Sequence, residues 1–159
     1  YLFGRASERL PSWFRGLPWF GRVRHVRTSF LPDDLGLCEH SDGELRVTTS
    51  TVERAILEFL QHRRLDTASY EHANLIFESL GGLRPDLVQS LLSACTSIRV
   101  KRLFLHLAER HSHTWMKHLD LTQISLGSGK RSLVSGGRLD PKYLITVPGN
   151  ADETRTDFL

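Results

Sequence analysis

Apolar positions recur with a helical period through the middle of the chain. Val52, Ile56 and Leu60 share one face of a helix in this pattern. Ser50 and Glu53 have the spacing of a capping box, in which a hydroxyl and a carboxylate satisfy free amides at a helix start. The pattern therefore predicts a first long helix directly after Ser50, with Glu53 as part of its cap.

Three further helices are predicted after the first. One covers about residues 69–80 and stops at Gly81-Gly82, because glycine favours the position after a helix end. The next begins at Pro85, since proline suits the first turn. The last covers about residues 98–110, with the sequence IRVKRLFLHLAER.

Alternating apolar and polar positions predict strands on both sides of this helical block. Residues 22–30 alternate Val with Arg, and residues 35–50 form a hairpin pattern with Asp42-Gly43 as its turn. Residues 123–134 and 142–148 read as two more strands. The expected fold class is α+β (mixed α/β), with β-strands at both ends of the chain flanking a block of about four α-helices.

The last predicted helix carries a row of cationic side chains beside its apolar face. At 100° per residue, Arg99, Arg102, His106 and Arg110 fall within an arc of about 80°, and Lys101 lies next to it. Two interpretations stay open. The row is either the solvated face of a core helix or an electrostatic contact with phosphates or an acidic protein.

Composition narrows the class of protein only slightly. A chain of 159 residues, 40% apolar and 25% charged, fits one domain with a real core. A net charge of +3 permits an acidic partner without requiring one. Two distant cysteines argue against a disulfide framework, and no apolar run approaches the roughly 20 residues that cross a bilayer. A cytoplasmic protein without membrane contact is therefore expected.

The first 21 residues combine aromatic rings with two prolines that exclude a long helix. Pro11 and Pro18 lie on either side of "SWFRGL". Trp13 and Trp19 either pack on the core, as part of a strand or short helix, or form an interface with a partner or another domain.

The stretch LGSGKRSLVSGG, residues 126–137, has the composition of a phosphate-binding loop but not its spacing. A Walker-type loop requires G-x-x-x-x-G-K-[ST]. Ile124 stands where the first glycine is needed, and Arg131 replaces the hydroxyl residue. The stretch is instead read as bends permitted by glycine, which either present Lys130 and Arg131 on a cationic surface or form only a tight turn.

No catalytic residue and no metal ligand is assigned from the sequence. The histidines between residues 106 and 118 lack the convergent cysteine or carboxylate partners of a zinc site. Pro32-Asp33 followed by Glu44-Leu45-Arg46 resembles a metal-dependent nuclease motif, but arginine cannot act as the lysine does. We expect a protein that is not an enzyme and has no cofactor, with a degenerate nuclease-like domain as an alternative.

Four segments together resemble the C-terminal domain of AbiEi-type antitoxins, which belong to bacterial type IV toxin–antitoxin (abortive infection) systems. The segments are YLFGRASERLPSWF, TSTVERAILEFL, IRVKRLFLHLAER and LGSGKRSLVSGGRLDPKYLITVP. The matching positions are Glu53, Arg54, Lys101, Arg102, Gly127, Gly129, Lys130, Arg131, Gly136, Gly137, Tyr143 and Pro148. The resemblance covers residues 1–148 and leaves residues 149–159 as a polar tail.

The resemblance implies an antitoxin domain that counteracts a nucleotidyltransferase-like toxin without forming a stable complex with it. Family members join this domain to an N-terminal winged helix, which binds operator DNA and represses the operon. No winged-helix segment is recognisable here and the chain begins at Tyr1, so we expect a fragment from which that domain is absent. The alternative is a protein-interaction or dimerisation module.

Contact with nucleic acid or a partner is expected through a basic surface, and an aromatic interface is expected at Trp13 and Trp19. The residues of the basic surface are Arg99, Lys101, Arg102, Arg110, Lys130, Arg131 and Arg138. A further hypothesis is that the protein associates with itself through these aromatic residues.

Overall fold

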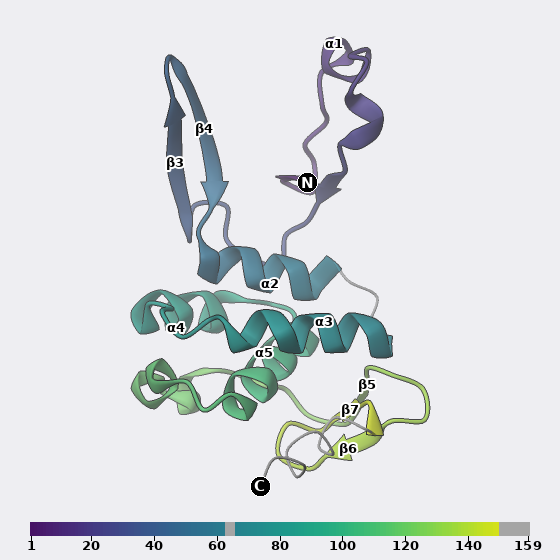
Figure 1. Ribbon diagram of the computed structural model, residues 1–159, viewed down its shortest axis with the longest axis vertical. Coiled ribbons are helices and arrows are strands. Elements are labelled where there is room, and N and C mark those ends of the chain that lie inside the picture. Colours follow the sequence, from purple (N-terminus) through teal and green to yellow (C-terminus); the bar gives the residue numbers. More distant parts are fainter. Residues whose placement is uncertain (63–65, 150–159) are drawn as a thin grey trace, which may run out of the picture.

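The computed structural model describes residues 1–62 and 66–149, so the predicted tail lies outside the described residues except for Gly149. The fold is α+β, as predicted. Helices form a central body, a hairpin and the N-terminal segment stand on one side of it, and a small sheet lies on the opposite side (Figure 1).

Four helices of more than two turns make up the central body. They are α2 (Val52–His62), α3 (Thr67–Glu78), α4 (Pro85–Ala94) and α5 (Ile98–Arg110). The start at Pro85 and both ends of α5 are confirmed. A single turn, α1 (Ser12–Arg15), occupies the N-terminal segment.

The hydrophobic core is built around α5. Leu103, Phe104 and Leu107 are fully buried, because their spacing puts them on the face that packs against α2 and α3. The Phe104 ring meets the rings of Phe77 and Trp115, with centroids 5.3 and 5.8 Å away. The core is therefore mainly helical, and the C-terminal sheet adds the buried side chains of Ile145 and Val147 to it.

The capping box predicted at the start of α2 is not formed. The helix begins at Val52, and the Ser50 hydroxyl donates to Glu58 Oε2 at 2.7 Å. Glu53 instead accepts hydrogen bonds from the backbone and guanidinium of Arg84, at 2.9–3.0 Å. A tertiary ion pair has replaced the local contact, because Arg84 lies beside the first turn of α2.

Two small sheets stand on one side of the helices (Figure 1). Strand β1 (Leu2–Gly4) pairs in parallel with β2 (His25–Arg27), around α1 and the short 3-10 helix η1 (Phe20–Arg22). Strands β3 (Leu37–Asp42) and β4 (Leu45–Ser50) form the predicted hairpin, with Asp42 paired to Leu45. Almost every side chain of this hairpin is exposed.

The C-terminal sheet differs from the two strands predicted there. It has three short strands in the order β5-β7-β6, and β7 (Ile145–Val147) lies between β5 (Arg131–Ser132) and β6 (Arg138–Asp140). Gly127 and Gly129 have positive φ, which breaks the first expected strand into a loop. Two 3-10 helices, η2 (Thr114–His118) and η3 (Leu121–Gln123), connect α5 to this loop. Among the described residues, no helix is long and apolar enough to cross a membrane.

Candidate partner-contact surfaces

Arg102 lies inside the molecule, not on the predicted basic surface. Only 1% of its surface is exposed. Its guanidinium donates to four backbone carbonyls: those of Leu126, Gly127 and Gly129 in the glycine loop, and that of Leu144 before β7, at 2.6–3.3 Å. Arg102 therefore organises the loop from within, and the loop covers it.

Two other members of the predicted basic surface also have structural positions. Lys101 is buried. Arg99 is half-buried and donates to the carbonyls of Leu60 and Gln61, at 3.1 and 2.8 Å. These carbonyls belong to the last turn of α2, where a cation satisfies free acceptors and complements the helix dipole. Lys101 and Arg102 therefore do not lie on an exposed basic surface as expected from the sequence, because neighbouring elements cover that side of α5, and Arg99 is only partly exposed.

The other four predicted basic residues reach the surface around the C-terminal sheet. Lys130, Arg131 and Arg138 are exposed, and Arg110 is half-buried. Arg131 and Arg138 lie on strands at opposite edges of the sheet, because β7 separates β5 from β6. Arg110 and Arg138 line one hollow together with His106 and Asp140. These four side chains are the part of the predicted surface that a partner can reach.

A hydrogen-bonded chain of three side chains lies at this hollow. His106 Nδ1 is 2.6 Å from Asp140 Oδ2, and His106 Nε2 is 2.8 Å from the Tyr70 hydroxyl. The other Asp140 oxygen accepts the backbone amides of Lys142 and Tyr143. The chain joins α3, α5 and β6, so it ties the C-terminal sheet to the helical body.

The protonation states follow from burial and from these contacts. Burial lowers the pKa of His106 despite the opposing effect of Asp140. Burial acts to raise the pKa of Asp140, but hydrogen bonds from Tyr143, His106 and Lys142 lower it overall. Burial also raises the pKa of Tyr70. The lowered pKa favours a neutral imidazole, which can donate from Nδ1 to the Asp140 carboxylate and accept the Tyr70 hydroxyl proton at Nε2.

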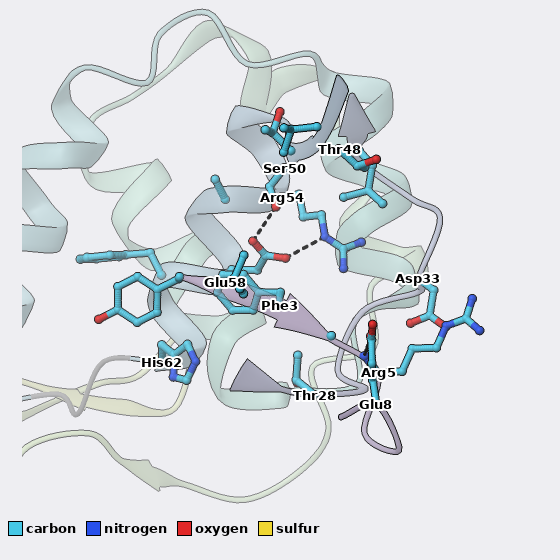
Figure 2. Close-up of a pocket in the computed structure, with 18 residues that line it drawn as sticks. Phe3, Arg5, Glu8, Thr28, Asp33, Thr48, Ser50, Arg54, Glu58 and His62 are labelled. Atoms are coloured by element: carbon cyan, nitrogen blue, oxygen red, sulfur yellow. Dashed lines mark hydrogen bonds and ion pairs between the residues drawn. The ribbon is translucent and has the colours of Figure 1, made fainter. Parts of the chain in front are cut away.

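A groove of about 590 Å³ lies between β1, β4 and α2 (Figure 2). Tyr1 and Phe3 stack beside His62 at one end, with ring centroids 5.6–6.3 Å apart. Arg5 and Asp33 form an ion pair of 2.7 Å at the other end. One end of the groove is therefore aromatic, and at the other end an ion pair neutralises the charges of Arg5 and Asp33.

The middle of the groove holds a buried ion pair with a structural role. Arg54 Nε donates to Glu58 Oε1 at 2.8 Å, and the Ser50 hydroxyl donates to Oε2 (Figure 2). Arg54 also donates to the carbonyls of Pro32 and Leu35, both at 2.6 Å. Arg54 Nε, Arg54 Nη1 and both Glu58 oxygens are engaged, so the pair holds the segment before β3 against α2.

The aromatic residues of the N-terminal segment form a cluster of their own. Phe14 contacts the rings of Trp13, Trp19 and Phe20, with centroids 5.1–6.0 Å apart in edge-to-face arrangements. Trp13 is 69% exposed and Trp19 46% exposed. The tryptophans do not pack on the core, so the structure leaves them accessible to a partner.

The residues of the nuclease-like motif lie in different environments. Asp33 pairs with Arg5, whereas Glu44 lies in the turn between β3 and β4. Within the ranges 1–62 and 66–149, no group of three or more His, Cys, Asp or Glu side chains converges as a metal site would require.

Sequence reasoning missed Glu58 as a structural residue and missed the burial of Arg102. Glu58 sits in the apolar run ILEFL, and Arg102 sits between VK and LFL. A charged residue inside an apolar stretch is a signal for a buried, fully bonded side chain. The hydrogen-bonded side chains of Tyr70, His106 and Asp140 had no such signal, because successive members are 34–36 residues apart in the sequence.

The family model described as "Transcriptional regulator, AbiEi antitoxin, Type IV TA system" matches residues 1–148. No curated protein and no solved structure matches the chain.

Proposed function

Because this chain belongs to the AbiEi antitoxin family of type IV toxin–antitoxin regulators, we propose that it counteracts a nucleotidyltransferase-like toxin without forming a stable complex with it. The observation that carries the proposal is the extent of the family match. Residues 1–148 include every described element from β1 to β7. The family match therefore rests on the whole fold and not on one short motif.

The use of the buried charges supports an action that is not enzymatic. Arg102 binds loop carbonyls, Arg54 binds Glu58, and Glu53 binds Arg84. Such contacts stabilise the fold and leave the antitoxin role to the molecular surface. We place that role on the exposed cations of the C-terminal sheet, above all Lys130 and Arg131, which the loop around Arg102 presents together.

A growth assay tests the antitoxin proposal. The chain is produced in bacteria together with the nucleotidyltransferase-like protein encoded beside it, and colony formation is counted. We expect this chain to restore growth, and size-exclusion chromatography of the mixed proteins to show two separate species. Failure to restore growth would contradict the antitoxin role, and a stable complex would contradict the proposed mode of action.

Charge-reversal variants locate the surface in the same assay. The double variant Lys130→Glu, Arg131→Glu is expected to lose most of the rescue while keeping the circular dichroism spectrum of the parent. The matched control reverses Arg46 and Lys117, two exposed cations elsewhere on the molecule. Equal rescue by both double variants would move the active surface away from the C-terminal sheet.

Repression of the operon is proposed for this domain in combination with a winged helix. The test is a promoter–reporter fusion from the same operon, measured with the complete reading frame and with residues 1–159 alone. We expect repression by the complete product and none by residues 1–159. Full repression by residues 1–159 would show that no further DNA-reading module is needed.

A further inference from the structure

The positive charge of this protein is concentrated at its N-terminal end. Residues 1–27, called here the N-terminal lobe, contain six arginines and one carboxylate, that of Glu8. The lobe therefore has a formal charge of +5, whereas the whole chain has +3 and the remainder has −2. Such a division of charge is the electrostatic footprint of a surface that meets a polyanion.

Most of these arginines are exposed and not engaged by acidic side chains. Arg5 pairs with Asp33. The other five are exposed, and within the described part of the chain none has a carboxylate partner. They are Arg9, Arg15, Arg22, Arg24 and Arg27. Guanidinium groups bind phosphate oxygens through paired hydrogen bonds, so five available ones favour a chain of phosphates.

The same lobe presents flat aromatic surfaces between its cations. Arg15 lies between Trp13 and Trp19 in the sequence, and Arg22 follows three residues after Trp19. The two exposed indole rings are held edge-on against Phe14, which fixes their positions before any partner binds. Aromatic rings that are held in position before binding lose little side-chain entropy when a partner binds.

Along the sequence of the lobe, aromatic rings alternate with cations, as bases alternate with phosphates along a single strand. An indole can stack on a base only where that base is unpaired, and stacking does not depend on base identity. The part of the lobe around α1 also stands away from the helical body, so an extended strand can approach it (Figure 1). An acidic protein would use the arginines but would not need two exposed planar rings beside them.

We propose that the N-terminal lobe is a binding surface for single-stranded nucleic acid, with Trp13 and Trp19 stacking on unpaired bases and the five available arginines holding phosphates. This surface is separate from the cations of the C-terminal sheet. It does not depend on the toxin or on the antitoxin proposal, so either proposal can fail while the other holds.

Tryptophan fluorescence of residues 1–159 tests the proposal directly. The titrant is a single-stranded 20-nucleotide oligonucleotide of mixed sequence, and a stacked base quenches an indole. Trp115, the remaining tryptophan, is 3% exposed and serves as an internal background. We expect quenching on binding, and a loss of affinity of about 100-fold between about 50 and about 200 mM salt, as five phosphate contacts on a single strand predict.

Two sets of variants separate stacking from charge. Trp13→Ala and Trp19→Ala should each weaken binding about tenfold, the loss expected for one stacked base. Arg15→Gln combined with Arg22→Gln should weaken binding and reduce its salt dependence. The matched controls are Leu75→Ala and Arg46→Gln, an exposed apolar and an exposed cationic residue outside the lobe, and both should bind as the parent does.

Three results would overturn the proposal. In the first, inorganic polyphosphate binds as tightly as the oligonucleotide and the tryptophan variants bind like the parent, which would indicate charge alone. In the second, phosphatidylserine vesicles bind and the oligonucleotide does not, which would make the lobe a membrane surface. In the third, light scattering shows a dimer that the tryptophan variants abolish, again without oligonucleotide binding. Circular dichroism and thermal unfolding confirm that each exposed-site variant is folded.

Discussion

At the scale of single residues, Arg102 joins α5 to the glycine loop and to the residue before β7. It occupies a stretch that otherwise reads as a core helix, and it satisfies carbonyls of a loop that makes few regular hydrogen bonds. Burial, with a smaller contribution from Arg131, lowers the pKa of its guanidinium, which nevertheless stays charged. A buried charge is tolerated here because four carbonyl dipoles replace its hydration.

Removal of this side chain is expected to destabilise the protein strongly. Arg102→Ala leaves a cavity and buried carbonyls without donors, and should lower the free energy of unfolding by about 3–5 kcal/mol. Lysine cannot replace the planar fork, so Arg102→Lys should also lose most of this stabilisation. Urea unfolding measures both, with Lys130→Ala as the exposed control within about 0.5 kcal/mol of the parent. A small effect of Arg102→Ala would mean that the loop holds its shape unaided.

Glu53 predicts a dependence of stability on pH. Hydrogen bonds from Arg84 lower its pKa from 4.5 to about 2, although burial opposes them. Since the folded-state pKa lies below the unfolded-state pKa, this stabilisation is complete above about pH 5 and is lost as pH falls towards 2. It amounts to about 2 kcal/mol, because solvent screens the largely exposed Arg84 guanidinium.

The measurement compares urea unfolding of the parent and of Glu53→Gln from pH 6 down to pH 3. We expect the two proteins to differ most at pH 6 and to converge as pH falls. Glu71→Gln changes an exposed carboxylate on α3 and is the matched control. A constant difference between parent and Glu53→Gln over this range would contradict the assigned ion pair.

At the scale of elements, the sequence predicted helices and strands correctly where a single periodic pattern determines the structure. The ends of α5 follow from its apolar positions, and the hairpin follows from Asp42-Gly43 between two alternating runs. Reasoning failed where a partner distant in sequence decided the result. The period put Arg102 beside Arg99 but carried no information about the loop that covers it. Likewise, β6 exists only because β7 pairs with it.

The two adjacent glycines before β6 should respond differently to the same substitution. Gly136 has a φ of +71° but open space around it, so Gly136→Ala costs only backbone strain of about 1 kcal/mol. A methyl group at Gly137 would overlap the Val147 carbonyl and the Val134 side chain. Gly137→Ala should therefore force β6 and β7 apart and cost about 3 kcal/mol.

Thermal unfolding of both variants tests this order. Gly149→Ala serves as the control, because an added methyl group there meets open space and the residue has no positive φ. If Gly136→Ala proved the more harmful change, backbone conformation would outweigh the close approach of β6 and β7.

At the scale of the whole molecule, stability and exposure are unevenly distributed. The core lies among the helices, whereas β3 and β4 place almost no side chain in it. The charge is uneven as well, since the N-terminal lobe is strongly cationic and the remainder slightly anionic. The net charge of +3 does not show this division, because the −2 of the remainder offsets part of the +5 of the lobe.

Hydrogen exchange should show the uneven stability directly. We expect amides of α5 to exchange only through global unfolding, and those of β3 and β4 to exchange at least about 100-fold faster through local opening. The comparison is made by mass spectrometry or NMR at one pH. Equal protection of the hairpin and α5 would indicate that a partner, such as a second copy, covers the hairpin in solution.

The position of Arg102 also bears on how the chain reaches its native state during synthesis. Its acceptors lie between Leu126 and Leu144, which leave the ribosome after all of α5. Until then the helices can assemble only with a hydrated cation on the side of α5 that is later covered. The last of these contacts can therefore form only when Leu144 has been synthesised. A chain that ends before Leu144 keeps the Arg102 guanidinium without its full set of carbonyl acceptors.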